Sequence, residues 1–132
     1  MALFTRPSVS LRDQHFPGQA PIDVYGEGVF RFAEMSHPGS LLCLPSGIYG
    51  WPVGSAAEIT PEALSDVFAE AADIALLVIG CGRDVALVPK SLREQLKQSG
   101  IGVEVMATGP AVRTYNILLA EGRPVAAALV VI

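Results

Sequence analysis

The stretch that decides the fold is IALLVI, Ile74–Ile79, a run of six apolar residues. A strand that is apolar on both faces must be covered on both sides, which is typical of parallel sheets packed between helices. Gly80–Cys81–Gly82 follows at once and marks the end of the strand. IALLVI is therefore expected to be a buried central strand.

Helical patterns alternate with apolar strands after this stretch. Ser91 and Glu94 have the spacing of a capping box, and Gly100 is a natural helix stop. GVEVM then predicts a strand, and a helix is expected from Thr108, as N-cap, to Gly122, before the final strand PVAAALVVI. The order strand, helix, strand, helix, strand predicts right-handed parallel crossovers.

The chain before IALLVI has the pattern of antiparallel strands. PIDVYGEGVFRFAEM alternates around Gly26–Glu27–Gly28, which predicts a hairpin. SLLCLPSGIYGWPV predicts two short strands with a break at Pro45–Ser46–Gly47, and a helix is expected to start at Thr60 as N-cap with Pro61 in its first turn.

These patterns predict an α/β fold: a three-layer single domain with a mainly parallel central sheet flanked by helices and an added N-terminal β-hairpin layer. The domain is expected to span residues 21–132. Residues 1–20 contain Pro7, Pro17 and Gly18 without periodicity, and we expect them to form a loosely ordered N-terminal arm.

Composition limits the classes of function. The 132 residues suit one domain, 51% of them are apolar, and the net charge is −4. The nine lysines and arginines are scattered singly, so no basic stripe could follow a nucleic-acid backbone. With so high an apolar fraction, apolar residues must either enlarge the buried core or form a surface patch for a partner.

Cysteines and histidines give no sign of a metal or cofactor. Cys43 and Cys81 are far apart, and His15 and His37 have no ligands at a suitable spacing. VAAALVVI, the longest apolar run, is too short to span a bilayer. No signal peptide is evident at the N-terminus. We therefore expect no metal, no cofactor, no transmembrane segment and a cytoplasmic protein.

The most favourable place for a site is the carboxyl edge of the parallel strands, where helix N-termini converge. GCGRD has only the first two glycines of a dinucleotide fingerprint, so a plain turn is favoured there. Cys81 is expected to be a packed thiol rather than a nucleophile. The candidate ligand- or partner-binding residues are Gly80, Cys81, Gly82, Arg83, Thr108, Arg113 and Asn116.

The helix TGPAVRTYNILLAEGRP, 108–124, divides by spacing. Tyr115 falls on the apolar face and should pack in the core. Asn116 lies at the edge of that face, where it either bonds the backbone of a loop, the favoured interpretation, or faces a pocket. Glu121 and Arg123 flank Gly122 and should pair locally or cap the helix end.

An ordered set of short motifs resembles the family of complex I (NADH dehydrogenase) assembly factor 3 and its uncharacterised bacterial relatives. The set covers roughly residues 21 to 131 and comprises YGEGVFRF, GSLLCLPSGIYGW, a TPE helix start, LLVIGCG and TYN followed by EGRPVAAAL. The matching positions are Gly26, Gly28, Gly39, Ser40, Trp51, Gly80, Gly82, Tyr115, Asn116, Glu121, Gly122 and Arg123.

The resemblance implies a small three-layer α/β fold and, for the mitochondrial members, a non-catalytic role in building complex I through contacts with other proteins. It supplies no catalytic residues. The chain has no plausible presequence, so a mitochondrial location would apply only if one is missing here.

Two functions of different classes follow. The first is a non-enzymatic protein-interaction or assembly factor with protein partners and an open oligomeric state. The alternative is a small-molecule or anion-binding domain, conceivably an enzyme, with its pocket at the carboxyl ends of the parallel strands.

Overall fold

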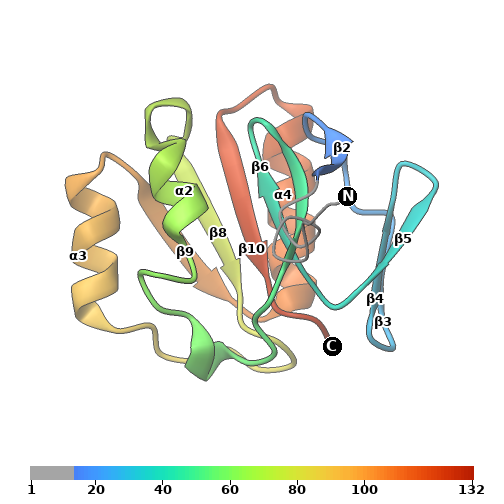
Figure 1. Cartoon of the computed structure of the whole chain (residues 1–132), viewed down its shortest axis with the longest axis horizontal. Helices are drawn as coiled ribbons and strands as arrows, with labels where there is room; N and C mark the ends of the chain where they lie inside the picture. The colour runs from blue at the N-terminus through green and yellow to red at the C-terminus, as the bar shows by residue number, and fades with distance from the viewer. Residues whose placement is uncertain (1–13) are drawn as a thin grey trace, which may run out of the picture.

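The computed structural model describes residues 14–132, and residues 1–13 of the predicted arm lie outside the described residues (Figure 1). Six strands come first, and helices and strands alternate after them, with two short 3₁₀ turns in the middle. In order the elements are β2 (Gln14–Pro17), β3 (Val24–Gly26), β4 (Val29–Phe32), β5 (Met35–Pro38), β6 (Ser40–Leu44), β7 (Gly47–Trp51), η1 (Ala56–Glu58), α2 (Ser65–Ala69), η2 (Ala71–Asp73), β8 (Leu76–Gly80), α3 (Lys90–Gln98), β9 (Gly102–Met106), α4 (Thr108–Ala120) and β10 (Val125–Leu129).

The main sheet has six strands in the order β2-β7-β6-β10-β8-β9. β10 lies parallel to β8, with Ala127 opposite Val78, and antiparallel to β6, with Ala127 opposite Cys43. β8 and β9 are parallel, whereas β2, β7 and β6 pair antiparallel. IALLVI and VAAALVVI are therefore neighbouring central strands that run parallel, as predicted.

The sheet is mixed, which corrects the expectation of a mainly parallel one. β6 and β7 are joined by Pro45–Ser46 alone, and so short a connection can form only an antiparallel hairpin. Parallel pairing is confined to β10, β8 and β9, which are joined through α3 and α4. The α/β class, the flanking helices and the hairpin layer are confirmed.

Helices cover the two faces of the sheet differently. β8 leads through α3 outward to β9, and β9 returns through α4 past β8 to β10. Right-handed crossovers that move in opposite directions place their helices on opposite faces of a sheet. α2 and α3 accordingly lie on one face, and α4 lies on the other (Figure 1).

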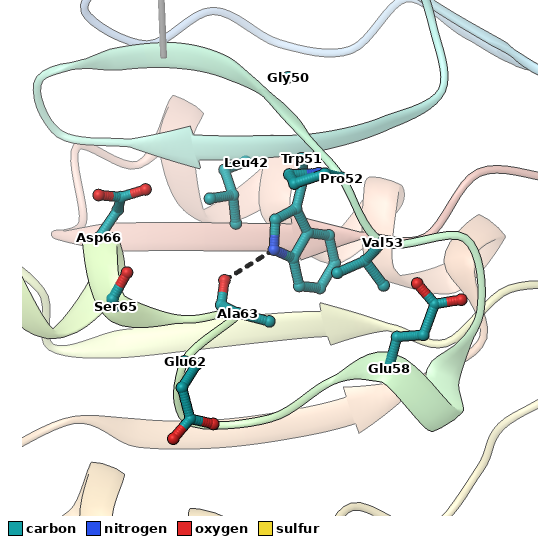
Figure 2. A pocket seen from close by; sticks show the side chains of 10 residues that line it. All are labelled: Leu42, Gly50, Trp51, Pro52, Val53, Glu58, Glu62, Ala63, Ser65 and Asp66. Carbon is teal, nitrogen blue, oxygen red and sulfur yellow. Dashed lines mark hydrogen bonds between the residues drawn. The ribbon is translucent and has the colours of Figure 1, made fainter. Parts of the chain in front are cut away.

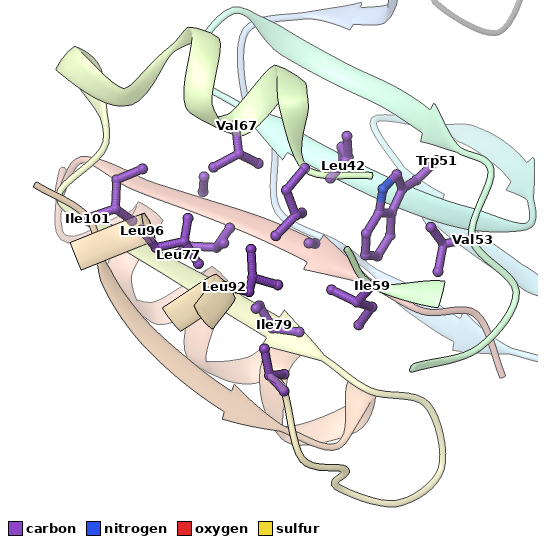
Figure 3. Packing of buried hydrophobic residues seen from close by; sticks show 14 of the residues in the cluster. Leu42, Trp51, Val53, Ile59, Val67, Leu77, Ile79, Leu92, Leu96 and Ile101 are labelled. Atoms are coloured by element: carbon purple, nitrogen blue, oxygen red, sulfur yellow. The ribbon is translucent and has the colours of Figure 1, made fainter. Parts of the chain in front are cut away.

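Each face has its own apolar core. In β8, Leu77 and Ile79 point toward α2 and α3, where they meet Val67, Leu92 and other buried side chains (Figure 3). Val78 points the other way, into a cluster with the α4 face and the three-stranded sheet. This alternation explains why IALLVI carries no polar residue.

The predicted hairpin layer is a three-stranded antiparallel sheet, β3-β4-β5. Tyr25 faces Phe30 across the turn at Gly26–Glu27–Gly28. Phe30 and Phe32 are fully buried and belong to the same core as Tyr115 of α4. The hairpin therefore completes the core on the α4 side.

Helix starts and the N-terminal arm differ from the sequence expectations. Thr60 does bond the backbone N–H of Ala63 (3.1 Å), but only turns follow, and α2 begins at Ser65. Lys90 begins α3, one residue before the predicted start, and no side chain caps it. Residues 14–17, assigned to the arm, form β2 at the edge of the main sheet.

Hydrogen exchange should follow strand position. We expect the amides of β8 and β10 to exchange slowest, because each strand has a partner on both sides and buried faces. Edge strand β9 should exchange faster. Exchange measured residue by residue by NMR would contradict the topology if β8 amides exchanged as fast as those of β9.

Candidate functional site

Buried hydroxyls hold the carboxyl edge of β8 and β10. The backbone N–H of Gly82 donates to the Thr108 hydroxyl (2.9 Å), which donates to the carbonyl of Val130 (2.7 Å). Thr108 has no exposed surface and makes no cap bond, and the N-cap position belongs to Ala107. The predicted N-cap role of Thr108 is therefore wrong, because its hydroxyl bonds to two strand ends instead.

Ser40 makes the equivalent connection from β6. Its hydroxyl donates to the carbonyl of Val53 (2.5 Å) and accepts from the N–H of Val131 (2.9 Å). Ser40 and Thr108 are the two buried polar side chains among the described residues. Both have a donor and an acceptor partner, so neither is left for a ligand without breaking a bond.

Glycine is required at Gly80 by close approach of α4. A Cβ there would lie 3.0 Å from both Cα and Oγ1 of Thr108 and 3.1 Å from Cβ of Ala111. Gly82 has a φ of +105°, which favours glycine. The two glycines of GCG therefore serve the contact between β8 and α4.

Cys81 and Arg83 complete this edge. Cys81 is buried, and its thiol contacts the carbonyl of Ala86 at 3.8 Å. Arg83 is exposed at the border of a shallow hollow of ≈ 380 Å³. The other residues that line the hollow are Gly54, Ser55, Ala56, Cys81, Gly82, Asp84, Val130, Val131 and Ile132.

Asn116 is not part of that hollow. Its side-chain amide accepts from the N–H of Ile22 and donates to the carbonyl of Ile22, both at 2.9 Å. This is the bond to a loop backbone that the helix-wheel position favoured. Arg113 is exposed on α4 and does not line the hollow either. The structure therefore brings together Gly80, Cys81, Gly82, Arg83 and Thr108, but not Arg113 and Asn116.

Tyr115 packs in the core, as predicted, and fixes the same segment. Its hydroxyl donates to the carbonyl of Ala20 (2.9 Å). Burial raises the pKa of Cys43 to about 12, although a hydrogen bond with Tyr115 opposes this, and burial likewise raises the pKa of Tyr115 above its ordinary value. Both groups are neutral at physiological pH, so the pair is built for packing.

Glu121 and Arg123 lie beside each other at the end of α4, with 3.6 Å between Oε1 and Nη1. Both side chains are more than half exposed, so the pair is screened by solvent and contributes little stability. It agrees with the expectation of local pairing.

A second hollow, of ≈ 500 Å³, lies beside the end of β7 (Figure 2). We call it the Trp51 groove, after the residue whose indole lies at its centre. Its lining is Leu42, Gly50, Trp51, Pro52, Val53, Glu58, Glu62, Ala63, Ser65 and Asp66. Sequence analysis missed it because the predicted helix start at Thr60 did not indicate where residues 52–66 lie relative to the strands.

The loop between β8 and α3 carries the most exposed large apolar side chain of residues 14–132. Leu87 is 98% exposed and Val85 63% exposed, whereas Val88 is buried in the core. Residues 85–88 form an irregular loop. Four consecutive apolar residues fit either a strand or a surface patch, and sequence alone could not separate the two.

The described residues contain no group of histidine, cysteine and carboxylate side chains that could hold a metal ion. Among the helices of residues 14–132, none is long and apolar enough to cross a membrane.

The architecture is that of a mixed α/β domain and is similar to a solved Mth938-like domain. A Bordetella pertussis protein described as a Mth938-like domain superimposes with a TM-score of 0.75 at 29% identity, over 98% of this chain and 92% of that one. The crystal structure of a Bartonella henselae protein, named as an outer membrane protein, superimposes with a TM-score of 0.86 at 50% identity, over 89% and 98%.

The chain belongs to the family of proteins of unknown function DUF498/DUF598, whose profile matches residues 22–130. It is 41% identical to an uncharacterised protein of Rhodobacter capsulatus over 89% of this chain and 90% of that protein. It is also 33% identical to NADH dehydrogenase (ubiquinone) 1 alpha subcomplex assembly factor 3 of Mus musculus, over 97% of this chain and 69% of that protein. The resemblance found in the sequence is thereby confirmed.

Thr108→Val should destabilise the protein. The substitution keeps the shape of the side chain but leaves Gly82 N–H and Val130 C=O without the hydroxyl, at a cost of about 1–3 kcal/mol for each buried group. Thr108→Ser is the control, because it keeps the hydroxyl and loses roughly one methyl group, about 1 kcal/mol. Equal urea midpoints for the valine and serine variants would contradict the hydroxyl bridge.

Asn116→Ala should also destabilise the protein, by about 1–3 kcal/mol, because the backbone groups of Ile22 lose their partner. Arg113→Ala, on the exposed side of the same helix, should change the free energy of unfolding by less than about 0.5 kcal/mol. Thermal and urea unfolding of both variants checks this. An Asn116→Ala protein as stable as Arg113→Ala would show that the Ile22 contact is dispensable.

Proposed function

We propose that this protein is a non-enzymatic interaction protein that helps to assemble a larger protein complex in the bacterial cytoplasm. The observation that carries the proposal is the relationship, over nearly the whole chain, to proteins named as NADH dehydrogenase assembly factors. Respiratory complex I or a comparable multi-subunit complex is the class of partner that this relationship favours. The comparable relationship to an uncharacterised bacterial protein leaves the particular partner to experiment.

The polar residues of the strand ends support an interaction role. Thr108, Ser40 and Asn116 each bond backbone groups of other segments, and the thiol of Cys81 is packed against Ala86. These polar groups already have hydrogen-bond partners within the fold, so they stabilise the fold rather than bind a substrate. A contact surface for a protein requires only exposed side chains of suitable chemistry.

The loop 83–89 offers such side chains. Val85 and Leu87 project from the carboxyl edge of β8, and large exposed apolar side chains are costly unless a partner covers them. Arg83 and Asp84 lie directly before them and are exposed, so the patch has a polar border typical of protein contacts. We assign this loop as a principal contact with the assembly partner.

An alternative use of the same edge is the binding of a small anion. The ≈ 380 Å³ hollow beside Cys81 and Gly82 has the Arg83 guanidinium at its border, which favours a negatively charged ligand. That hollow also contacts the C-terminal residues Val130–Ile132. Substitution of Arg83 therefore distinguishes this alternative from the protein-contact role of Val85 and Leu87.

Affinity capture at native expression tests the proposal. We expect wild-type protein to recover a reproducible protein partner. The double variant Val85→Ser, Leu87→Ser should bind that partner about tenfold more weakly, equivalent to a hot-spot loss of roughly 1.4 kcal/mol. Thermal stability should be unchanged, because both side chains are exposed. Ile117→Ser, an exposed apolar residue on α4, is the matched control and should retain the partner.

Three outcomes would contradict this assignment. Capture without any reproducible partner would oppose the assembly role itself. Equal loss with Ile117→Ser would show that general surface hydrophobicity, and not this loop, governs capture. Loss with Arg83→Ala while the Val85, Leu87 variant binds normally would favour the anion-binding alternative.

A further inference from the structure

The floor of the Trp51 groove is apolar and has no spare donor. Leu42, Trp51 and Val53 are buried side chains that line it. The indole N–H of Trp51 donates to the carbonyl of Ala63 at 2.8 Å, and an indole has no other hydrogen-bonding group. Trp51 is only 4% exposed, so the indole contributes a narrow apolar part of the floor (Figure 2).

The walls of the groove are acidic. Glu58, Glu62 and Asp66 line the groove together with Trp51 (Figure 2), and among residues 14–132 no lysine, arginine or histidine lines it. The Glu58 carboxylate accepts from the N–H of Gly54 (3.1 Å) and the hydroxyl of Ser55 (3.4 Å), which holds it at the rim. A carboxylate has further acceptor positions after two such bonds.

The surrounding sequence reinforces this charge. Residues 32–82 contain six carboxylates and no lysine or arginine, whereas the whole chain has nine basic residues and a net charge of −4. The part of the chain that forms the groove is therefore more acidic than the protein as a whole. Its field favours a positively charged occupant.

Trp51 lies at the same edge of the sheet as the exposed loop. β7 runs antiparallel to β6, and β6 runs antiparallel to β10, so Trp51 at the end of β7 lies at the edge where β8 and β10 also end. Residues 54–56 border the hollow beside Arg83, and Glu58 lines the groove. The segment after β7 therefore contributes to both hollows.

We propose that the Trp51 groove binds an extended basic segment of a partner protein, with arginine against the carboxylates and an apolar neighbour on the floor. The inference rests on the proposed interaction function and names the chemistry of the segment bound. Arginine suits the site better than lysine, because its planar guanidinium pairs with a carboxylate through two parallel N–H bonds. The volume of ≈ 500 Å³ lies within the range of roughly 300–1,000 Å³ that ligand pockets occupy.

The test uses the purified full chain and a short synthetic peptide of alternating arginine and leucine. Trp51 is the one tryptophan in the sequence, so its fluorescence reports directly on the groove. We expect saturable fluorescence change on peptide addition and an affinity that falls as salt is raised, because salt screens the exposed carboxylates. A peptide with glutamine in place of arginine should bind much more weakly.

Matched variants locate the interaction. Glu62→Gln should weaken binding roughly threefold and the double variant Glu58→Gln, Glu62→Gln about tenfold, as expected for exposed ion pairs. Glu94→Gln on α3 removes the same charge from an exposed helix outside the groove and should leave binding unchanged. Melting temperatures measured alongside show whether each variant is folded, and Glu62→Gln, at an exposed position, should melt like wild type.

Several results would overturn the proposal: equal weakening by Glu94→Gln, equal binding of the glutamine peptide, or no change in Trp51 fluorescence. A synthetic peptide of residues 1–13, which contains Arg6 and Arg12, serves as a competitor. Displacement by it would assign the groove to the chain's own segment and contradict the partner assignment. The peptide assay needs no captured partner. A negative result in it would therefore reject the groove proposal without affecting the affinity-capture test of Val85 and Leu87.

Discussion

The hydroxyl of Thr108 is the interaction on which the sheet edge depends. It joins Gly82, two residues after β8, to Val130, the residue after β10, and belongs to the first residue of α4. Ser40 joins the start of β6 to the same C-terminal segment. Backbone groups beyond the last paired residue of a strand have no ladder partner, and in a buried position they must find one. Two short side chains satisfy these groups and so allow the edge to be closed by α4 and the segment after β7.

Side chains two turns further along α4 bond other backbone groups in the same way. Asn116 and Tyr115 bond the backbone of Ile22 and Ala20, and the side chain of Gln19 bonds the carbonyl of Val125 (2.7 Å). The segment between β2 and the hairpin layer is thereby held without a strand partner of its own. Thr108, Tyr115 and Asn116, which the sequence singled out, are used in the fold, whereas Arg113 is exposed.

Local sequence patterns predicted the helices and strands better than they predicted which segments pack against them. The double-sided apolar runs IALLVI and VAAALVVI identified the two central strands, and helix periodicity placed Tyr115 in the core. Thr108 looked like an N-cap because threonine favours that position, but two long-range hydrogen bonds outweigh this preference. The antiparallel neighbour of β10 and the Trp51 groove depend on segments distant in sequence, for which periodicity carries no information.

The central claim is that this domain acts through the carboxyl edge of its main sheet, with α4 and its polar residues as support. Hydrogen–deuterium exchange of the protein alone and in complex with its captured partner tests this most directly. The account predicts new protection in residues 52–66 and 83–89, with unchanged exchange at Ile22 and along the exposed side of α4. Protection centred on α4 and the hairpin layer, with none at the sheet edge, would contradict it.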